Sequence, residues 1–540
     1  MLSSGPVRQS LAALALFACL AVVHTWPLAT APARLSRNDT PDTVLNEWIL
    51  AWEAHQAVHD PRHFFDANIF YPERHTLAYS EYLLAPAAMA APMLWLGASP
   101  VLVYNLLLLA GLTLTAWATW RLVTSWTGDA TAGLVAGALA AFNAHTLTRM
   151  PHLQAIHFEF FPLALLALDR VLTGPARARD AALLAVVVAL QGLTSYYSLV
   201  FTTVALAVGA LVRPSDWIGA RARTVLPQLA IAAALAAAMM LPFLLMYAGV
   251  GEVRPLDEVA RGAATWRDYL DTPARIHASW SARYYGGASA LYPGSIAIAL
   301  TAVALATGLA VRDRRARMAL AFGAAGVALS FGPSLPGYAT LYRWLLPLQG
   351  VRNVARFGYL ATVATAILAG YGLVTIRRHW RDARAWPALV AVLVALVTSD
   401  SIAAPIDYVP AAAVPRLEAR LRNTNAVVAY IPFFAPGRIF HNADYLLEST
   451  ANWRPMINGY SGIMPASYEV HARAIATFPS ADAIDALRRM GVTHVWVHDR
   501  LLREWTDNET ADAVAHAPGL ERLAEDGDLR LYAIKKSDEE

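Results

Sequence analysis

The 540-residue chain is poor in charge, in lysine and in cysteine. Charged residues make up 15% and hydrophobic residues 57% of the chain, whereas soluble chains carry about 25% charged residues, so a single soluble globule is excluded. Lysine occurs only at 535 and 536, and the net charge of +3 is too small for a nucleic-acid-binding protein of this length. The one cysteine, Cys19, lies in an apolar run, which excludes a disulfide framework and a cysteine metal cluster.

Phosphate-binding and metalloprotease motifs are also missing from the sequence. It contains no G-x-G-x-x-G, no G-x-x-x-x-G-K-[ST], no H-E-x-x-H and no protein-kinase motifs. An intracellular nucleotide-driven motor and a nucleotide-sugar enzyme are therefore disfavoured. If the protein is an enzyme, we expect its chemistry at the external face, on a substrate already anchored in lipid.

The sequence does contain many apolar runs close to the roughly 20 residues that a membrane-spanning helix needs. Arginine clusters between these runs mark the cytoplasmic loops. They predict a polytopic α-helical membrane protein with eleven crossings, a cytoplasmic N-terminus and an external C-terminus. The expected spans are 11–28, 100–122, 129–146, 154–171, 181–197, 198–212, 224–248, 292–311, 318–333, 357–376 and 386–403.

Two short segments near the N-terminus leave alternatives open. The run 83–96 is short and contains two prolines, and counting it as a crossing would place the arginines near 177 outside, so we interpret it as interfacial or re-entrant. The tripeptide 31–33 loosely resembles a signal-peptide cleavage site, so cleavage there competes with an N-terminal span.

The sequence predicts two domains, a transmembrane domain over 1–403 and a small external α/β domain over 404–540. The second has ordinary polarity and alternating strand and helix signals, with strands expected at 426–434, 492–497 and 529–534 and a helix at 481–490. The transmembrane domain carries two long external loops, 29–82 and 249–290, and long loops on a membrane scaffold are usually functional.

In the first external loop, an acidic residue precedes an apolar helix. Apolar residues recur there at helical spacing at 45, 48, 49 and 52 and include two tryptophans, which suits a helix lying in the membrane interface. Asp42 stands just before this stripe and Asn46 one turn into it. Asp42 is a candidate general base, and a helix-capping role is the structural alternative.

Cationic residues gather at the expected external mouths of other spans. Arg352 and Arg356 are four residues apart, so a helix would put both on one face, where they could bind a phosphate through bidentate hydrogen bonds. Arginines that end a helix at the interface are the alternative. Arg149 is a further phosphate-binding candidate. It belongs to a second group, which would also suit a divalent metal and comprises His145, Arg149, His152, His157 and Glu159.

This arrangement resembles the GT-C superfamily of integral-membrane glycosyltransferases, in a bacterial branch. The residues that carry the resemblance are the stretches 42–52, 66–72, 152–154, 352–357 and 458–462. The resemblance implies a multi-pass protein of the bacterial cytoplasmic (inner) membrane that transfers a sugar from a polyprenyl-phosphate donor. It also implies that an acid of the first external loop is the general base, which is Asp42 by position, with Asp39 as the substitute.

The expected chemistry is an inverting single displacement onto an acceptor hydroxyl of a glycan, a lipid or a protein. One carboxylate removes the proton from the hydroxyl, and positive charge stabilises the departing phosphate. The substrate-binding candidates are Asn46, Glu81, His152, Gln154, Asn458 and Tyr460. The choice of sugar and acceptor and the need for a divalent metal stay open.

Two other functions compete with glycosyl transfer. A transporter or flippase of lipid-linked glycans would need charged residues within the spans and an internal repeat, and Asp400 near the end of the last span is the only candidate for such a charge. The second competing function is a catalytically inactive scaffold, which would keep the GT-C architecture and use its tail for binding.

Overall fold

The computed structural model describes residues 4–37, 40–81, 83–175, 177–250, 254–286, 288–506 and 508–536. The chain folds into two compact units, one formed by Met1–Pro32 and Asn105–Asp407 and the other by Ala33–Tyr104 and Tyr408–Glu540. The tail thus shares its compact unit with most of the first external loop. The domain boundary at 403/404 that the sequence suggests stays a prediction.

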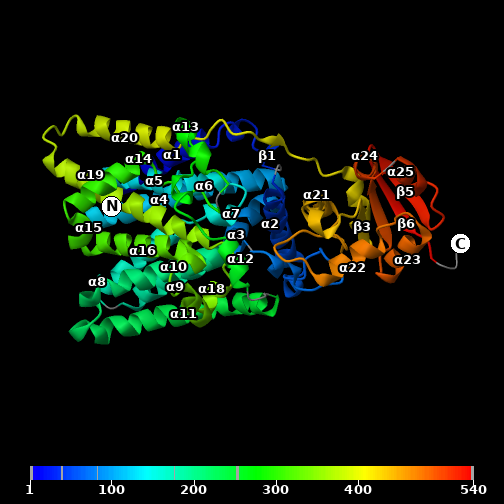
Figure 1. Ribbon diagram of the computed structural model, residues 1–540, viewed down its shortest axis with the longest axis horizontal. Coiled ribbons are helices and arrows are strands. Elements are labelled where there is room, and N and C mark those ends of the chain that lie inside the picture. Colours follow the sequence, from blue (N-terminus) through cyan, green and yellow to red (C-terminus); the bar gives the residue numbers. More distant parts are fainter. Residues whose placement is uncertain are drawn as a thin grey trace. The chain divides into compact units, whose positions relative to one another are not determined.

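The first unit is built from helices, many of which lie side by side in Figure 1. Within the described residues they are α1 (Ser4–His24), α4 (Pro100–Thr127, whose first five residues belong to the second unit), α5 (Ala130–Ala141), α6 (Ala144–Thr148), α7 (Leu153–Ile156), α8 (Phe160–Thr173), α9 (Ala178–Thr194), α10 (Tyr196–Leu211), α11 (Ala222–Val250), α12 (Leu256–Arg261), α13 (Ala278–Ser281), α14 (Ser295–Ala306), α15 (Leu309–Arg312), α16 (Arg314–Ser330), α17 (Tyr338–Trp344), α18 (Leu346–Gln349), α19 (Gly358–His379) and α20 (Trp386–Ser401).

Several of these helices have the length and apolar composition of membrane spans. Five are long enough to cross, at Gly5–His24, Pro100–Thr127, Ala130–Thr148, Gly219–Val250 and Val354–His379, and shorter apolar helices lie at Leu84–Trp95, Tyr196–Leu211, Ser295–Ala306 and Trp386–Ser401. The polytopic helical fold class is therefore confirmed, while the count of eleven crossings stays a prediction.

Three of the expected spans are interrupted, and one of them, 292–311, divides into α14 and α15 at Thr307 and Gly308. The run 129–146 divides into α5 and α6 because Asn143 acts as N-cap of α6, its Oδ1 accepting a 3.1 Å hydrogen bond from the amide of Thr146. The run 154–171 likewise divides into α7 and α8. The breaks after α5 and α7 lie next to polar residues, whose side chains compete with the helical backbone for hydrogen bonds.

The core of the first unit surrounds α19, which packs against α5, α14 and α16. Small residues allow these close contacts. A Cβ added at Gly372 would lie 1.9 Å from the carbonyl oxygen of Leu300, so only glycine lets α14 approach α19 at this point.

At one end of the first unit, arginines that the sequence assigns to cytoplasmic loops are bound by aspartates. Arg213 is fully buried, and its guanidinium donates to Asp169 Oδ1 at 2.7 Å and to Asp216 Oδ2 at 2.6 Å. Arg315 donates to the other oxygen of Asp169 at 3.0 Å. Because each buried charge has a partner, this network can join α8, α10 and α16 without an unpaired charge.

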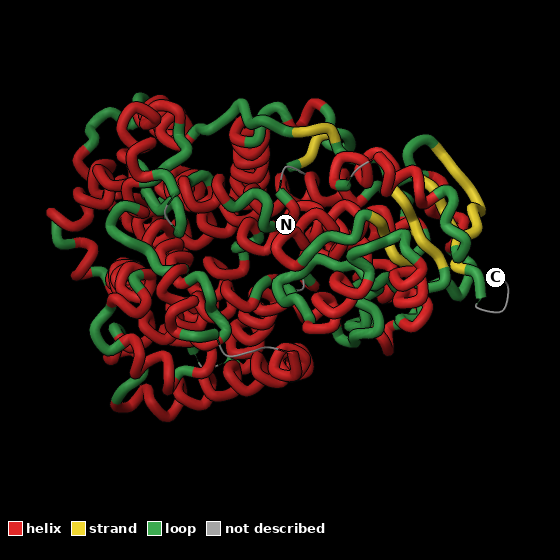
Figure 2. The backbone as a smooth tube through the Cα atoms, turned by 45° about the vertical axis from the view of Figure 1, so that its right-hand side comes forward, coloured by secondary structure: helices red, strands yellow, loops and turns green. Residues whose placement is uncertain are grey.

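The second unit combines helices with two small sheets, the only strands among the described residues (Figure 2). Strands β1 (Leu35–Ser36) and β2 (Val409–Pro410) are antiparallel, and a four-stranded sheet has the order β3 (Val428–Ile431), β4 (His494–His498), β6 (Leu529–Ile534), β5 (Leu520–Asp526). Strands β3 and β4 are parallel, with Val428 opposite His494, and the other pairs are antiparallel. The helices are α2 (Pro41–His59), α3 (Leu84–Trp95), α21 (Ala443–Glu448), α22 (Ala466–Ala474), α23 (Ala481–Arg489), α24 (Asp499–Trp505) and α25 (Asn508–Val514).

The strands and the helix predicted for the tail are confirmed as β3, β4, β6 and α23. Their apolar faces meet in one core, in which Ile431, Leu487 and Val495 are almost completely buried. Short apolar runs such as Val428–Ile431 are the local signal that the sequence supplied.

Helix α2 differs from the predicted interfacial helix. Its apolar stripe is buried, but so are the polar residues between, including Asn46, Glu47 and Glu53. The helix packs against α3 and α21 of the same unit. It is a core helix of the second unit rather than a helix with one face in lipid, because protein covers it on more than one side.

Candidate functional site

The second unit holds Asp42 in the first turn of α2. Pro41 is the first helical residue and Thr40 the N-cap, so Asp42 is not the cap residue that the structural alternative requires. At this position a carboxylate interacts favourably with the positive end of the helix dipole. The hydroxyl of Tyr460 donates a 2.7 Å hydrogen bond to Asp42 Oδ1, which also favours the ionised form.

Two neighbours fix the position of this carboxylate. The side-chain amide of Asn46 donates to the backbone carbonyl of Asp42 at 2.6 Å and is almost completely buried. Tyr460 packs against a small apolar cluster that contains Val44 and Leu447. Asn46 and Tyr460 therefore hold Asp42 in place, one through the backbone and one through the carboxylate.

Asn458, predicted to bind substrate, is part of the framework. It is fully buried; its Nδ2 donates to the carbonyl of Tyr430 at 3.0 Å, and its Oδ1 accepts from the amide of the same residue at 2.8 Å. Its own carbonyl accepts from the amide of Phe70 at 2.9 Å. The side chain completes the hydrogen bonding of β3, and its role in substrate binding stays a prediction. Glu81 is half-buried, and Asp39 lies outside the described residues.

Sequence reasoning missed a buried carboxyl beside this site. Burial raises the pKa of Glu47 to about 8, although the hydroxyl of Ser36, 2.9 Å from Oε1, acts in the opposite direction. At neutral pH the side chain is therefore mostly protonated. The sequence signal was a glutamate directly before Trp48 in an apolar helical stripe.

The first unit brings together cationic and polar residues around Arg356. The side chains of Arg149, His152 and Arg356 all lie within electrostatic range of the buried His145. The Cζ atom of Arg356 lies 5.2 Å from the ring centroid of Tyr197, and its Nε is buried without a hydrogen-bond partner among the described residues. We call Arg149, His152 and Arg356, together with His145, the cationic cluster.

Arg149 also anchors the second external loop to this cluster. Its Nη2 donates to the carbonyl of Ala288 at 3.0 Å and to the hydroxyl of Ser289 at 2.9 Å. The buried Asp268 holds the same loop, since it accepts a 2.8 Å hydrogen bond from the amide of Ser289. The long loop is thus fixed beside the cationic cluster rather than free of it.

The predicted pairing of Arg352 with Arg356 on one helix face is wrong. Residues 354–357 form a 3₁₀ helix, and Arg352 precedes it in an irregular segment. The Arg352 side chain is 56% exposed and lies 3.9 Å from Glu258. Four-residue spacing implies a shared face only within an α-helix, and that helix begins at Gly358.

Tyr197 organises this segment and was not among the predicted residues. Its hydroxyl accepts hydrogen bonds from the backbone amides of Arg352 at 3.0 Å and Asn353 at 3.3 Å, while its ring supports Arg356. The sequence signal was a tyrosine pair, 196–197, at the start of an apolar run. One side chain thereby fixes both the segment and the guanidinium that follows it.

The residues proposed for a metal do not form a metal site. His157 Nδ1 lies 2.8 Å from Glu159 Oε1, so these two residues pair with each other. In the described ranges, no group of three or more His, Cys, Asp or Glu side chains could hold a metal ion. Gln154 is buried with its Oε1 lacking a hydrogen-bond partner in the described part of the chain.

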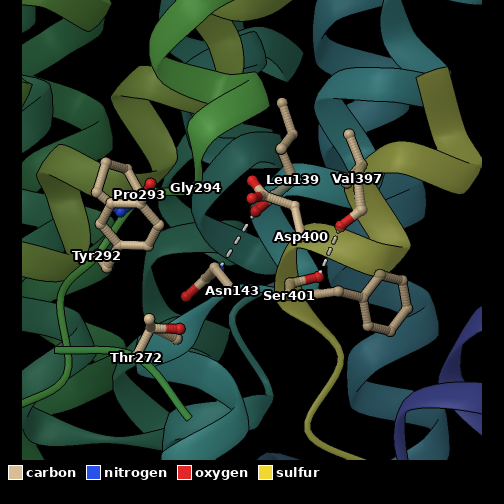
Figure 3. A pocket seen from close by; sticks show the side chains of 11 residues that line it. Leu139, Asn143, Thr272, Tyr292, Pro293, Gly294, Val397, Asp400 and Ser401 are labelled. Atoms are coloured by element: carbon tan, nitrogen blue, oxygen red, sulfur yellow. Dashed lines mark hydrogen bonds between the residues drawn. The ribbon is translucent and has the colours of Figure 1, made fainter. Parts of the chain in front are cut away.

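Asp400, the candidate charge for a transporter, is bound by its neighbours. Its Oδ1 lies 2.8 Å from His277 Nε2, and its Oδ2 accepts a 3.2 Å hydrogen bond from the amide of Ile296 in the first turn of α14. Figure 3 shows Asp400 with Asn143, Thr272 and Tyr292 around a cavity. Its free volume of about 10 Å³ admits about one water molecule.

The fold of this chain matches solved structures of other proteins. No family model matches the chain, and no curated protein matches it by sequence. The arabinofuranosyltransferase AftD from Mycobacteria superposes with a TM-score of 0.62 at 18% identity, over 98% of this chain and 40% of that one. The archaeal oligosaccharyltransferase AglB from Archaeoglobus fulgidus, in complex with an inhibitory peptide and a dolichol-phosphate, superposes with a TM-score of 0.54 at 14% identity, over 99% of this chain and 75% of that one.

The fold is of the GT-C type. A crystal structure of the same archaeal enzyme with Zn and sulfate has the same TM-score of 0.54 at 14% identity and covers 97% of this chain and 73% of that one. The chain spans only about two fifths of the AftD structure. The GT-C likeness runs through both units and confirms the resemblance that the sequence motifs suggested.

Proposed function

We propose that this GT-C protein is a membrane glycosyltransferase that moves a sugar from a polyprenyl-phosphate donor to an acceptor hydroxyl at the external face. The observation that carries the proposal is Asp42, an acid of the first external loop held by Tyr460 in the first turn of α2. The dolichol-phosphate bound to the archaeal oligosaccharyltransferase supports a lipid-phosphate donor. The arabinofuranosyl transfer for which AftD is named supports the reaction class.

Asp42 is the proposed general base. The acceptor hydroxyl must lose its proton as its oxygen attacks the anomeric carbon, so the base must be ionised before the reaction. The Tyr460 hydroxyl and the helix N-terminus both stabilise the ionised carboxylate. A single base is enough for an inverting displacement, because the phosphate leaves as a stable anion and needs no second carboxyl group to protonate it.

Arg356 and Arg149 are the proposed phosphate ligands of the first unit. The buried Nε of Arg356 has no hydrogen-bond partner within the described residues, and a buried guanidinium N–H without an acceptor favours binding of an anion. Arg149 shares the cationic cluster with it. These positive charges would stabilise the departing phosphate as its negative charge develops. Arg352 is a weaker candidate because it lies exposed beside Glu258.

Transfer from a radiolabelled donor tests the proposal directly. Purified protein in lipid vesicles is supplied with polyprenyl-phosphate pentoses and hexoses, and labelled product is measured with glycan, lipid and peptide acceptors. Wild-type turnover with at least one pair, lost in Asp42→Asn by about 100-fold or more, supports the proposal. The matched control is Asp60→Asn, which changes an exposed carboxylate of the same loop that pairs with His63 and should keep full turnover.

The competing functions give different results in the same vesicles. A flippase would move labelled lipid between leaflets without forming product, and an inactive scaffold would do neither. Equal turnover in Asp42→Asn and wild type would remove Asp42 as the base, and the same substitution at Asp39 would then be tested.

A further inference from the structure

The segment between α16 and α19 exposes an apolar surface. It contains the short helices α17 and α18, which form a hairpin over Tyr338–Gln349. Tyr338, Tyr342 and Leu348 point inward and are buried in the core of the first unit. The outward side carries Leu341, Trp344, Leu345 and Leu346, which are 40%, 80%, 47% and 71% exposed.

Hydrogen bonds hold the hairpin in this orientation. The hydroxyl of Tyr342 donates to the carbonyl of Arg254 at 2.5 Å, and the side-chain amide of Gln349 donates back to the carbonyl of Tyr342 at 2.9 Å. The rings of Tyr338 and Tyr342 stack with their centroids 6.1 Å apart. The exposed leucines therefore cannot turn inward without breaking the packing of the inner face.

A helix that is apolar on its outer as well as its inner side needs a second apolar environment. The outer surface of the hairpin is continuous with a helix that has the character of a membrane span. Tyr196 links the two, since its hydroxyl donates to the carbonyl of Pro347 at 2.9 Å and its ring lies 6.1 Å from the ring of Tyr247 in α11.

Helix α11 belongs to the candidate span Gly219–Val250, which has a mean hydropathy of 2.4 and is mostly unburied by protein. Its exposed residues near the same end include Leu241 and Leu245, at 53% and 61% exposure. If the exposed apolar side of α11 contacts lipid, the exposed apolar side of the neighbouring hairpin contacts the same lipid. The Arg343–Trp344 pair agrees with this, because tryptophan concentrates at the membrane interface and arginine extends toward the headgroups.

We infer that the α17–α18 hairpin inserts into the outer leaflet as a re-entrant element and that its occupant is phospholipid acyl chain. The inference stands on the exposed apolar surface and on α11, independently of the proposed enzymatic activity. It also has a consequence for that activity. The hairpin ends three residues before Arg352, so its insertion would hold the segment 352–356 at the level of lipid headgroups.

The single native cysteine makes a direct test simple. Cys19 is replaced by serine, a nitroxide is attached at Leu346→Cys, and the protein is reconstituted in vesicles of phosphatidylethanolamine and phosphatidylglycerol. Collision of the nitroxide with oxygen, which concentrates in lipid, is compared with collision with a water-soluble nickel chelate. Leu523→Cys on β5, a leucine that is 43% exposed, is the matched control.

We expect the ratio of oxygen to nickel collisions to be several-fold higher at 346 than at 523. A ratio equal to that at 523 would show that the hairpin lies in water and would overturn the inference. Poor access of both reagents at 346 would show that protein, such as a second copy of the chain, covers the surface, and this too would overturn it. Leu341→Cys, on the same outer surface, repeats the measurement if Leu346→Cys does not fold.

Discussion

The hydroxyl of Tyr460 lies 2.7 Å from Oδ1 of Asp42, a residue 418 positions earlier in the chain. This bond joins the first external loop to the tail within one compact unit. It gives the proposed base a hydrogen-bond donor that no local sequence pattern could reveal.

Tyr460→Phe should lower turnover by about tenfold, the loss expected for about 1.4 kcal/mol of hydrogen bonding. The variant removes the donor that holds the Asp42 carboxylate in place. Initial rates measure the loss, and Tyr71→Phe, in the same unit, serves as the control. Turnover equal to that of wild type would argue against a positioning role for Tyr460.

Arg356→Lys should lose most of its turnover, and Arg352→Lys should lose much less. Lysine keeps the positive charge but lacks the planar fork that binds two phosphate oxygens. Arg356 is in the cationic cluster, whereas Arg352 is exposed beside Glu258. Steady-state kinetics with the lipid-phosphate donor compare the two variants. A larger loss in Arg352→Lys than in Arg356→Lys would instead indicate that the phosphate binds at the irregular segment before the 3₁₀ helix.

Tyr197→Phe should reduce kcat/KM by about tenfold, the loss expected for about 1.4 kcal/mol of hydrogen bonding. The variant keeps the ring beneath Arg356 but removes the acceptor for the amides of Arg352 and Asn353. Tyr196→Phe, next in the sequence, is compared with it because it removes a hydroxyl that donates to the carbonyl of Pro347 instead. If kcat/KM falls equally in both variants, the loss arises from a change at the start of α10 and not from the positioning of Arg356.

Asn458→Ala should destabilise the second unit by about 1–3 kcal/mol, because it leaves the buried amide and carbonyl of Tyr430 without partners. Thermal unfolding followed by circular dichroism measures the loss. A stable variant with impaired turnover would instead support the substrate-binding role that the sequence suggested.

Glu47→Gln should flatten the pH dependence of stability. The pKa of Glu47 rises with burial from its ordinary value of 4.5 to about 8 in the fold. Between these values the unfolded chain loses the proton while the folded protein keeps it, so stability falls as pH rises. The amide is neutral throughout, and the melting temperature of the variant should decline less than that of wild type from pH 5 to 8. Glu521→Gln, at an exposed position of β5, should follow the wild-type curve.

Much of the fold could be read from the sequence because its signals are local. Runs of about 20 apolar residues predict spanning helices wherever they occur, and short apolar runs in the tail predicted β3, β4 and β6. The start of α2 differs by two residues from the predicted one, since the sequence pattern places Asp42 just before the helix whereas Pro41 is its first residue. The resemblance to GT-C proteins followed from the order of these elements.

The sites depended on contacts that only the tertiary structure decides. Three features depend on contacts between segments that are far apart in the chain. They are the burial of Glu47, the hydrogen bonds of Asn458 to β3, and the contact of Tyr197 with Arg356. Arg352 does not lie on the predicted helix face, because α19 begins only at Gly358. Helix α3 and most of the first external loop belong to the same compact unit as the tail. Hydropathy and backbone preference depend on residues that are close in sequence, and they determined where the helices and strands form. Hydrogen-bond partners and burial are set by which elements pack together, and the sequence alone carries no local signal for that.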